Sequence, residues 1–299
     1  MFNLLSAGFY RIRKNRLLWS CVLIMAVWSV ILCVEYWKNF VADYDGVLDE
    51  VSFMDSLFPT LSLVIMVFAV LVSIFLGTEY SDGTIRNKVT AGHTRGSIYL
   101  SQFIVSTAAC LTVYLLSLGV SALLGFLLLG GTDMPSTKIL IYCGTGVLMC
   151  VVDAAVFTLI TMTAGNKAAG AVICLLASFF LAAGAGTVYG PLSQEEYFYQ
   201  PRAVYEAMQG NNGTEVVVMG GDTEMEEENG MVKIPNPLYI SGQKRKIFEF
   251  LLDCNPVGQA VQLSELELER PINVAVYDLT EIVICCAAGM LLFCKKDLK

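Results

Sequence analysis

The sequence predicts an α-helical integral membrane protein with six membrane-spanning helices and both termini in the cytoplasm. Composition is the first observation: hydrophobic residues make up 56% of the 299-residue chain and charged residues only 15%. A soluble domain averages roughly 45–50% and 25%. The second is a mean hydropathy of +0.63, because a soluble globule this apolar could not cover its surface with polar side chains. The third is the presence of six apolar runs, each about as long as the 20 residues that cross a bilayer.

The six apolar runs extend over about 17–37, 57–77, 98–129, 139–163, 168–189 and 272–294. The third run is longer than a bilayer requires, so we expect it to tilt or to extend into the cytoplasm. Nine of the ten cysteines fall inside the runs, where cysteine acts as a small apolar packing residue. No Cys-x-x-Cys pair is present, so the sequence supports neither a zinc site nor a redox dithiol.

Charges between the runs predict the orientation. The residues before the first run carry four bases and no acid, a pattern that places this end in the cytoplasm. These bases are Arg11, Arg13, Lys14 and Arg16. The stretch after the second run and the C-terminal tail are also basic, whereas the stretch after the first run is acidic. We therefore expect a multi-pass protein of the plasma membrane, organised as 1–16, 17–190 with five spans, an extracellular segment 191–270, and 271–299 with the sixth span and a basic cytoplasmic tail.

The extracellular segment 191–270 is more polar than the rest of the chain. Within it, the run Glu215–Met219 predicts a short strand. The run Lys244–Leu252 predicts an amphipathic helix, and a second short segment follows over 259–268. The acidic run 226–228 lacks the spaced ligands of a calcium loop. We expect a small α+β lid rather than an enzyme domain.

The sequence contains none of the motifs that would indicate catalysis or nucleotide binding. The GxxxxGK[ST], HExxH and GxSxG patterns are absent, and the single histidine, His93, has no matching partner nearby. A net charge of −8 argues against a nucleic-acid partner, which requires a basic surface. We expect no enzymatic activity, and no metal or cofactor held by this chain.

The stretch between the second and third runs, residues 78–98, is the most informative part of the sequence. Asp82 or Thr84 can cap a short helix, and Gly92 can end it. The result would be about two turns lying across the membrane face, with a basic character given by Arg86 and Lys88. Such an element could dock into a groove of a soluble partner, or it could be a basic loop that only sets the orientation.

Residues 78–98 resemble the signature of type 2 permeases of ABC (ATP-binding cassette) exporters, the membrane subunits of bacterial multidrug and peptide-antibiotic export systems. The resemblance rests on Glu79-Tyr80, then Gly83-Thr84-Ile85-Arg86, then Gly92 and Arg95 before Tyr99. It extends over the whole chain through the basic N-terminus, the six runs and the extracellular segment. The stretches Asn236–Ile240 and Leu251–Asp253, with Gln259 and Gln262, also look like those of a Firmicute subgroup of this family.

The resemblance implies a transport subunit that exports a substrate such as a peptide antibiotic, a drug or a lipid. Such permeases pair as homodimers or heterodimers and bind a separate ATPase, which holds the ATP and magnesium. Residues 78–98 would be the coupling loop, and residues 1–16 an interfacial elbow helix whose bases anchor it at the lipid headgroups. The turn at Asn166-Lys167 would be a second, weaker contact. The residues at the ATPase-coupling loop would be Glu79, Tyr80, Asp82, Gly83, Thr84, Ile85, Arg86, Gly92 and Arg95.

Three acids lie inside predicted spans. Asp153 is near the middle of the fourth span, and Asp278 and Glu281 lie three residues apart on one face of the sixth. A carboxylate exposed to lipid is costly, so each should face protein or water. They are candidates for the translocation path of a cationic substrate, with structural hydrogen bonds as the alternative.

Two other functions stay open on the sequence alone. A stand-alone secondary transporter or channel could use Asp153, with Asp278 and Glu281, as an ion relay, although no pair of interrupted helices in repeated halves is apparent. A membrane-anchored sensor could bind extracellular peptides through residues 191–270.

Overall fold

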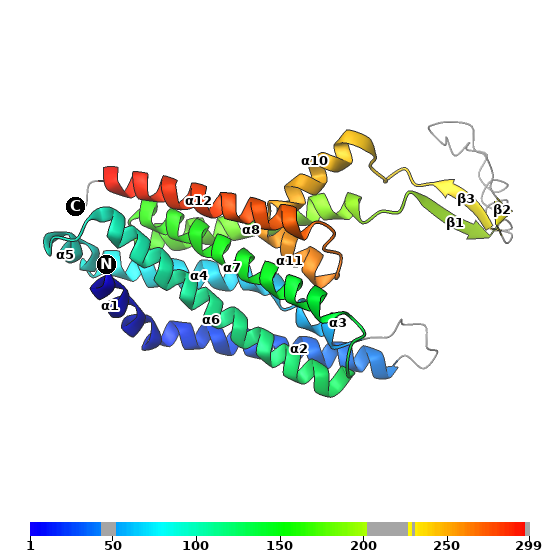
Figure 1. Ribbon diagram of the computed structural model, residues 1–299, viewed down its shortest axis with the longest axis horizontal. Helices are drawn as coiled ribbons and strands as arrows, with labels where there is room; N and C mark the ends of the chain where they lie inside the picture. Colours follow the sequence, from blue (N-terminus) through cyan, green and yellow to red (C-terminus); the bar gives the residue numbers. More distant parts are fainter. Residues whose placement is uncertain (43–51, 202–226, 229–230, 297–299) are drawn as a thin grey trace. The chain divides into compact units, whose positions relative to one another are not determined.

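The computed structural model describes residues 1–42, 52–201, 227–228 and 231–296 (Figure 1). The chain divides into two compact units. The first comprises Met1–Ala185 and Asp253–Lys299, and the second comprises Gly186–Leu252. The strand predicted at 215–219 lies outside the described residues.

Six helices are long and apolar enough to cross a bilayer, which confirms the predicted six-span helical membrane protein. They are α2 (Arg16–Ala42), α4 (Leu61–Ser81) preceded by the short α3 (Phe53–Leu57), α6 (Arg95–Leu129), α7 (Ser136–Ala164), α8 (Lys167–Leu192) and α12 (Pro271–Lys295). Helix α6 is the longest, as its apolar run predicts. The short α3 begins with a capping box, in which the Ser52 hydroxyl accepts from Met54 N and the Asp55 side chain accepts from Ser52 N.

Helix α4 lies within the first unit, packed against α7, α11 and α2. Its side chains are mostly buried, whereas α8 and α12 leave much of their apolar surface exposed in the described chain. In a bilayer such exposed apolar faces require no polar cover, because lipid tails are as apolar as the side chains. Two crossings with α6 are especially close. Gly289 of α12 and Gly146 of α7 leave room for the rings of Tyr99 and Tyr114, and a Cβ atom at either glycine would overlap the tyrosine oxygen.

A short helix, α11 (Pro256–Ser264), packs against α4 and α7 in the first unit. It begins three residues before the short segment predicted over 259–268. The reason is local, because the Asn255 side chain accepts from Val257 N at 3.0 Å and Pro256 occupies the first helical position.

The second unit contains a small antiparallel sheet and most of one helix. Strands β1 (Tyr197–Pro201), β3 (Met231–Pro235) and β2 (Glu227–Glu228) follow in the order β1-β3-β2, with Tyr197 opposite Pro235. Helix α10 (Gly242–Asp253) confirms the amphipathic helix predicted over 244–252. The sheet and helix between the fifth and sixth spans agree with the predicted α+β character of this segment.

Candidate functional site

The stretch between α4 and α6 forms a short helix, α5 (Thr84–Thr90), at the end of the bundle that also carries the N-terminus and the last turn of α12 (Figure 1). We call this the α5 end. The predicted helix of about two turns is confirmed, but the predicted cap at Asp82 or Thr84 is wrong. Gly83 is the N-cap, with φ +66°, and Asp82 instead ends α4. Glycine takes this left-handed conformation without strain, so the chain turns sharply from α4 into α5.

Glu79, in the last turn of α4, is 1% exposed and joins four helices. Its carboxylate contacts Arg11 Nη1 at 2.5 Å, Lys88 Nζ at 2.6 Å and Gln102 Nε2 at 2.7 Å. These partners come from α1 (Phe2–Arg13), α5 and α6. We call Glu79, Arg11, Lys88 and Gln102 the Glu79 hub. Two cations and an amide supply the donors that a buried carboxylate requires.

Helix α1 is positioned by its own small and apolar residues. Leu4, Gly8 and Ile12 recur every four residues and are buried, and Gly8 lies against the side chain of Val105 on α6. Arg11 therefore turns inward, where its guanidinium also lies 4.3 Å from the centre of the Phe75 ring. Of the bases expected at the headgroups, Arg13, Lys14 and Arg16 are exposed.

The two faces of the α5 element differ in exposure. Ile85 is buried and Lys88 is held by Glu79, so this face fixes the helix to the bundle. The opposite face is free of the bundle, and its exposed residues are Asp82, Arg86, Asn87, Thr90, Ala91 and Gly92. Thr84 and Tyr80 are partly exposed, and the Tyr80 hydroxyl donates to Met162 O at 2.8 Å.

A second set of contacts ties the end of α12 to the same region. Arg95, in the first turn of α6, donates to Cys294 O at 3.0 Å and to Lys296 O. The Lys296 ammonium donates to Thr163 O in the last turn of α7, where the helix dipole favours a cation. Burial lowers the pKa of Lys296. We call Arg95, Lys296 and Thr163 the tail clamp.

Residues 4–182 match the family model described as ABC-2 family transporter protein. The chain belongs to the ABC-2 transporter family. No curated protein matches it. The matched residues include all four members of the Glu79 hub and the whole of α5.

This ABC-2 subunit buries two of its three candidate path acids completely. Asp153 of α7 and Asp278 of α12 are 1% and 0% exposed, whereas Glu281 is partly exposed. Gln259 of α11 donates to Asp278 Oδ1 at 2.6 Å. Asp278 and Glu281 lie three residues apart on α12, which packs against α7, the helix that carries Asp153.

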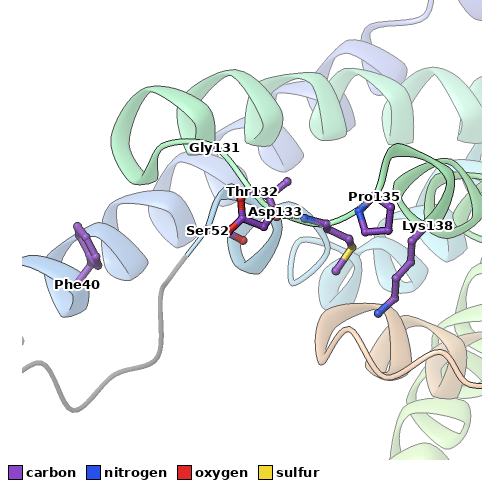
Figure 2. A pocket seen from close by; sticks show the side chains of 8 residues that line it. Phe40, Ser52, Gly131, Thr132, Asp133, Pro135 and Lys138 are labelled. Atoms are coloured by element: carbon purple, nitrogen blue, oxygen red, sulfur yellow. Dashed lines mark hydrogen bonds between the residues drawn. The ribbon is translucent and has the colours of Figure 1, made fainter.

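Two cavities lie at the end of the bundle opposite α5. One, of about 610 Å³, is shown in Figure 2, with Ser52 beside Thr132 and Asp133, Phe40 to one side and Lys138 to the other. Its remaining lining is Gly131, Met134 and Pro135. It presents one acid and one base, so it does not favour a ligand of either charge. The other, of about 530 Å³, is mainly apolar and includes Asp55 and Glu265, a lining suited to an amphipathic cation.

Sequence reasoning found Glu79 but not all of its partners. Gln102 of the hub and Lys296 of the tail clamp lie in no motif of the sequence. A glutamine inside an apolar run is the only available signal for Gln102, because a buried amide requires a polar partner.

Proposed function

We propose that this ABC-2 subunit pairs with a separate ATPase and a second permease copy, and that the exposed face of α5 is the surface that docks into the ATPase. The observation that supports this is the Glu79 hub. A docking helix can pass on a force only if it is fixed to the spanning helices, and Lys88 and Ile85 fix α5 to α4.

The geometry divides the coupling-loop residues into two roles. Asp82, Arg86 and Gly92 lie on the exposed surface and would touch the ATPase. Glu79 and Ile85 are buried, so they would act by positioning α5. The exposed turn at Asn166-Lys167, between α7 and α8, would add the second, smaller contact.

The hub also gives a route for the motion. Movement of α5 would be transmitted through Glu79 to α4, to α6 through Gln102 and to α1 through Arg11. Two spanning helices and the elbow would then shift together as a rigid body, which is how packed helices respond to a local displacement. In this proposal the ATP-driven movement of α5 switches the access of the translocation path.

The test is co-purification with the ATPase encoded beside this chain, in mild detergent. We expect Arg86→Glu to lower the retained ATPase at least tenfold, because it reverses a charge on the docking face. Gly83→Pro should have a similar effect by disturbing the turn into α5. Lys244→Glu is the matched control, an exposed charge reversal on α10, and should retain the ATPase as the wild type does. Retention of the ATPase by Arg86→Glu, or none by the wild type, would overturn the proposal.

A further inference from the structure

The acids of the described chain that are almost fully buried fall into two classes. They are Glu79, Asp153, Asp253 and Asp278, each no more than 2% exposed. Glu79 is neutralised by Arg11 and Lys88. Asp253 accepts from Arg270 Nε at 3.1 Å and from Gln262 Nε2 at 3.1 Å. A buried carboxylate with a cation and hydrogen bonds is the usual arrangement in proteins.

Asp278 and Asp153 lack such a cation among the described residues. The one hydrogen bond to Asp278 comes from Gln259, and Asp278 Oδ2 is buried with no donor within the described chain. Asp153 Oδ2 and Gln259 Oε1 are buried acceptors that likewise meet no donor there. Helices α7, α11 and α12 thus each carry one buried acceptor oxygen that meets no hydrogen-bond donor among the described residues, and α7 packs against both of the other helices.

The orientation of the Gln259 amide is fixed by its neighbours. Its Nε2 donates both to Asp278 Oδ1 at 2.6 Å and to Asp253 O at 2.8 Å. Both of these atoms are acceptors, so a flipped amide would set its oxygen against them. The Oε1 atom therefore stays on the side without a donor, adjacent to Asp278.

We propose that Asp278, Gln259 and Asp153 form a proton-binding site inside the membrane, with Asp278 as its principal carboxyl. A proton taken from water by Asp278 would neutralise its carboxylate and supply a donor to this group of acceptors. Left ionised, with no described donor to either Oδ2 atom, each buried carboxylate would be strongly disfavoured by its apolar surroundings.

The titratable groups around the site are mostly acids and thiols. Glu281 follows Asp278 by one turn on α12, while Cys110 of α6 and Cys150 of α7 lie within electrostatic range of Asp153. Asp253 and Cys254 precede α11, and the charge of Asp253 is balanced by Arg270. The charge that lacks a balancing cation therefore belongs to Asp153, Asp278 and Glu281.

Exchange of the proton would be governed by α11. This helix carries Gln259, which donates to Asp278, so a displacement of α11 that withdraws this donor and admits water would change the balance between the protonated and the ionised carboxyl and let the proton exchange. The site stands on contacts within this chain and is independent of the pairing with an ATPase.

Infrared spectroscopy of the purified full chain in nanodiscs at pH 7 tests the proposal without an ATPase or a transported substrate. The difference spectrum between wild type and Asp278→Asn should show the carbonyl band of a protonated carboxyl, lost in the variant. This band should shift when the wild type is transferred to deuterated buffer, because the proton exchanges. Asp253→Asn is the matched control, since a carboxylate paired with Arg270 should give the bands of an ionised group.

The other outcomes decide against the site. Loss of ionised carboxylate bands in Asp278→Asn would show that Asp278 carries no proton. A protonated band that does not shift in deuterated buffer would make the proton a fixed structural one. Replacement of the band by ionised bands when sodium is added at pH 7 would assign the site to a metal cation. Asn has nearly the size of Asp, and its side-chain oxygen can accept a hydrogen bond from Gln259. The variant Asp278→Glu keeps the carboxyl group and should retain the band of a protonated carboxyl.

Discussion

The substitution Glu79→Gln removes the charge at the centre of the Glu79 hub while keeping nearly the same shape. In the wild type the carboxylate contacts Arg11 at 2.5 Å and Lys88 at 2.6 Å, and Gln102 donates to it at 2.7 Å. The neutral amide cannot balance the two cations. We therefore expect α5 and α1 to be held less firmly against α4 and α6.

The size of the effect follows from the exposure of the partners. Breaking a buried ion pair by removing one member costs about 3–5 kcal/mol. The side chains of Arg11 and Lys88 are 36% and 16% exposed, so water would partly solvate both cations in the variant. The amide oxygen of Gln can also still accept a hydrogen bond, and both effects reduce the cost. We expect a loss of about 2 kcal/mol, which corresponds to roughly a 30-fold change in the equilibrium between docked and undocked α5.

Hydrogen–deuterium exchange of the full chain in nanodiscs measures this equilibrium. The amides of Asn87 and of the C-cap residue Ala91 bond to the carbonyls of Gly83 and Asn87, so they exchange when α5 opens. They should exchange about 30-fold faster in Glu79→Gln. Asp82→Asn is the matched control, because it removes an exposed acid three residues away. Exchange in Glu79→Gln within threefold of the wild type would refute the role given to the hub.

Two further predictions concern packing and a thiol. Gly289→Val would force the Tyr99 ring away from α12. It should destabilise the detergent-solubilised protein by about 1–3 kcal/mol, which would be measured as a lower Tm. Gly144→Val is the control, because a Cβ atom there meets open space; it should leave the Tm nearly unchanged, and equal losses of Tm in the two variants would contradict the packing argument. Burial, with the nearby acids Glu281 and Asp253, raises the pKa of the Cys254 thiol to about 11. A variant whose only cysteine is Cys254 should therefore react with iodoacetamide about 100-fold more slowly at pH 8 than an ordinary thiol. Its rate should still rise between pH 9 and pH 10.5, and a plateau by pH 9 would contradict the shift.

The spanning helices could be predicted from the sequence because one physical length, the thickness of the bilayer, fixes the length of each apolar run. The short helix α5 could be predicted as well, from the turn residues on either side of it. Its cap could not, because Asp82 can serve either α4 or α5, and only the left-handed Gly83 in the structure decides between them.

The hub could be predicted only in part. Glu79 stands in the motif, but Arg11 lies 68 residues before it and reads in isolation as one of four headgroup anchors. The repeat of Leu4, Gly8 and Ile12 contained the signal that this side of α1 faces the bundle. No pattern in the sequence pairs Gln259 with Asp278 either, because their contact depends on where α11 packs rather than on spacing along the chain.

The tail clamp has a consequence for the order of events during synthesis. Arg95 bonds to a carbonyl 199 residues further along the chain. At about 5–20 residues per second, Arg95 is made roughly 10–40 s before its partner at Cys294. Throughout that interval the first turn of α6, which follows α5 directly, lacks one of its restraints. The α5 end is therefore completed only after α12 has been translated and inserted.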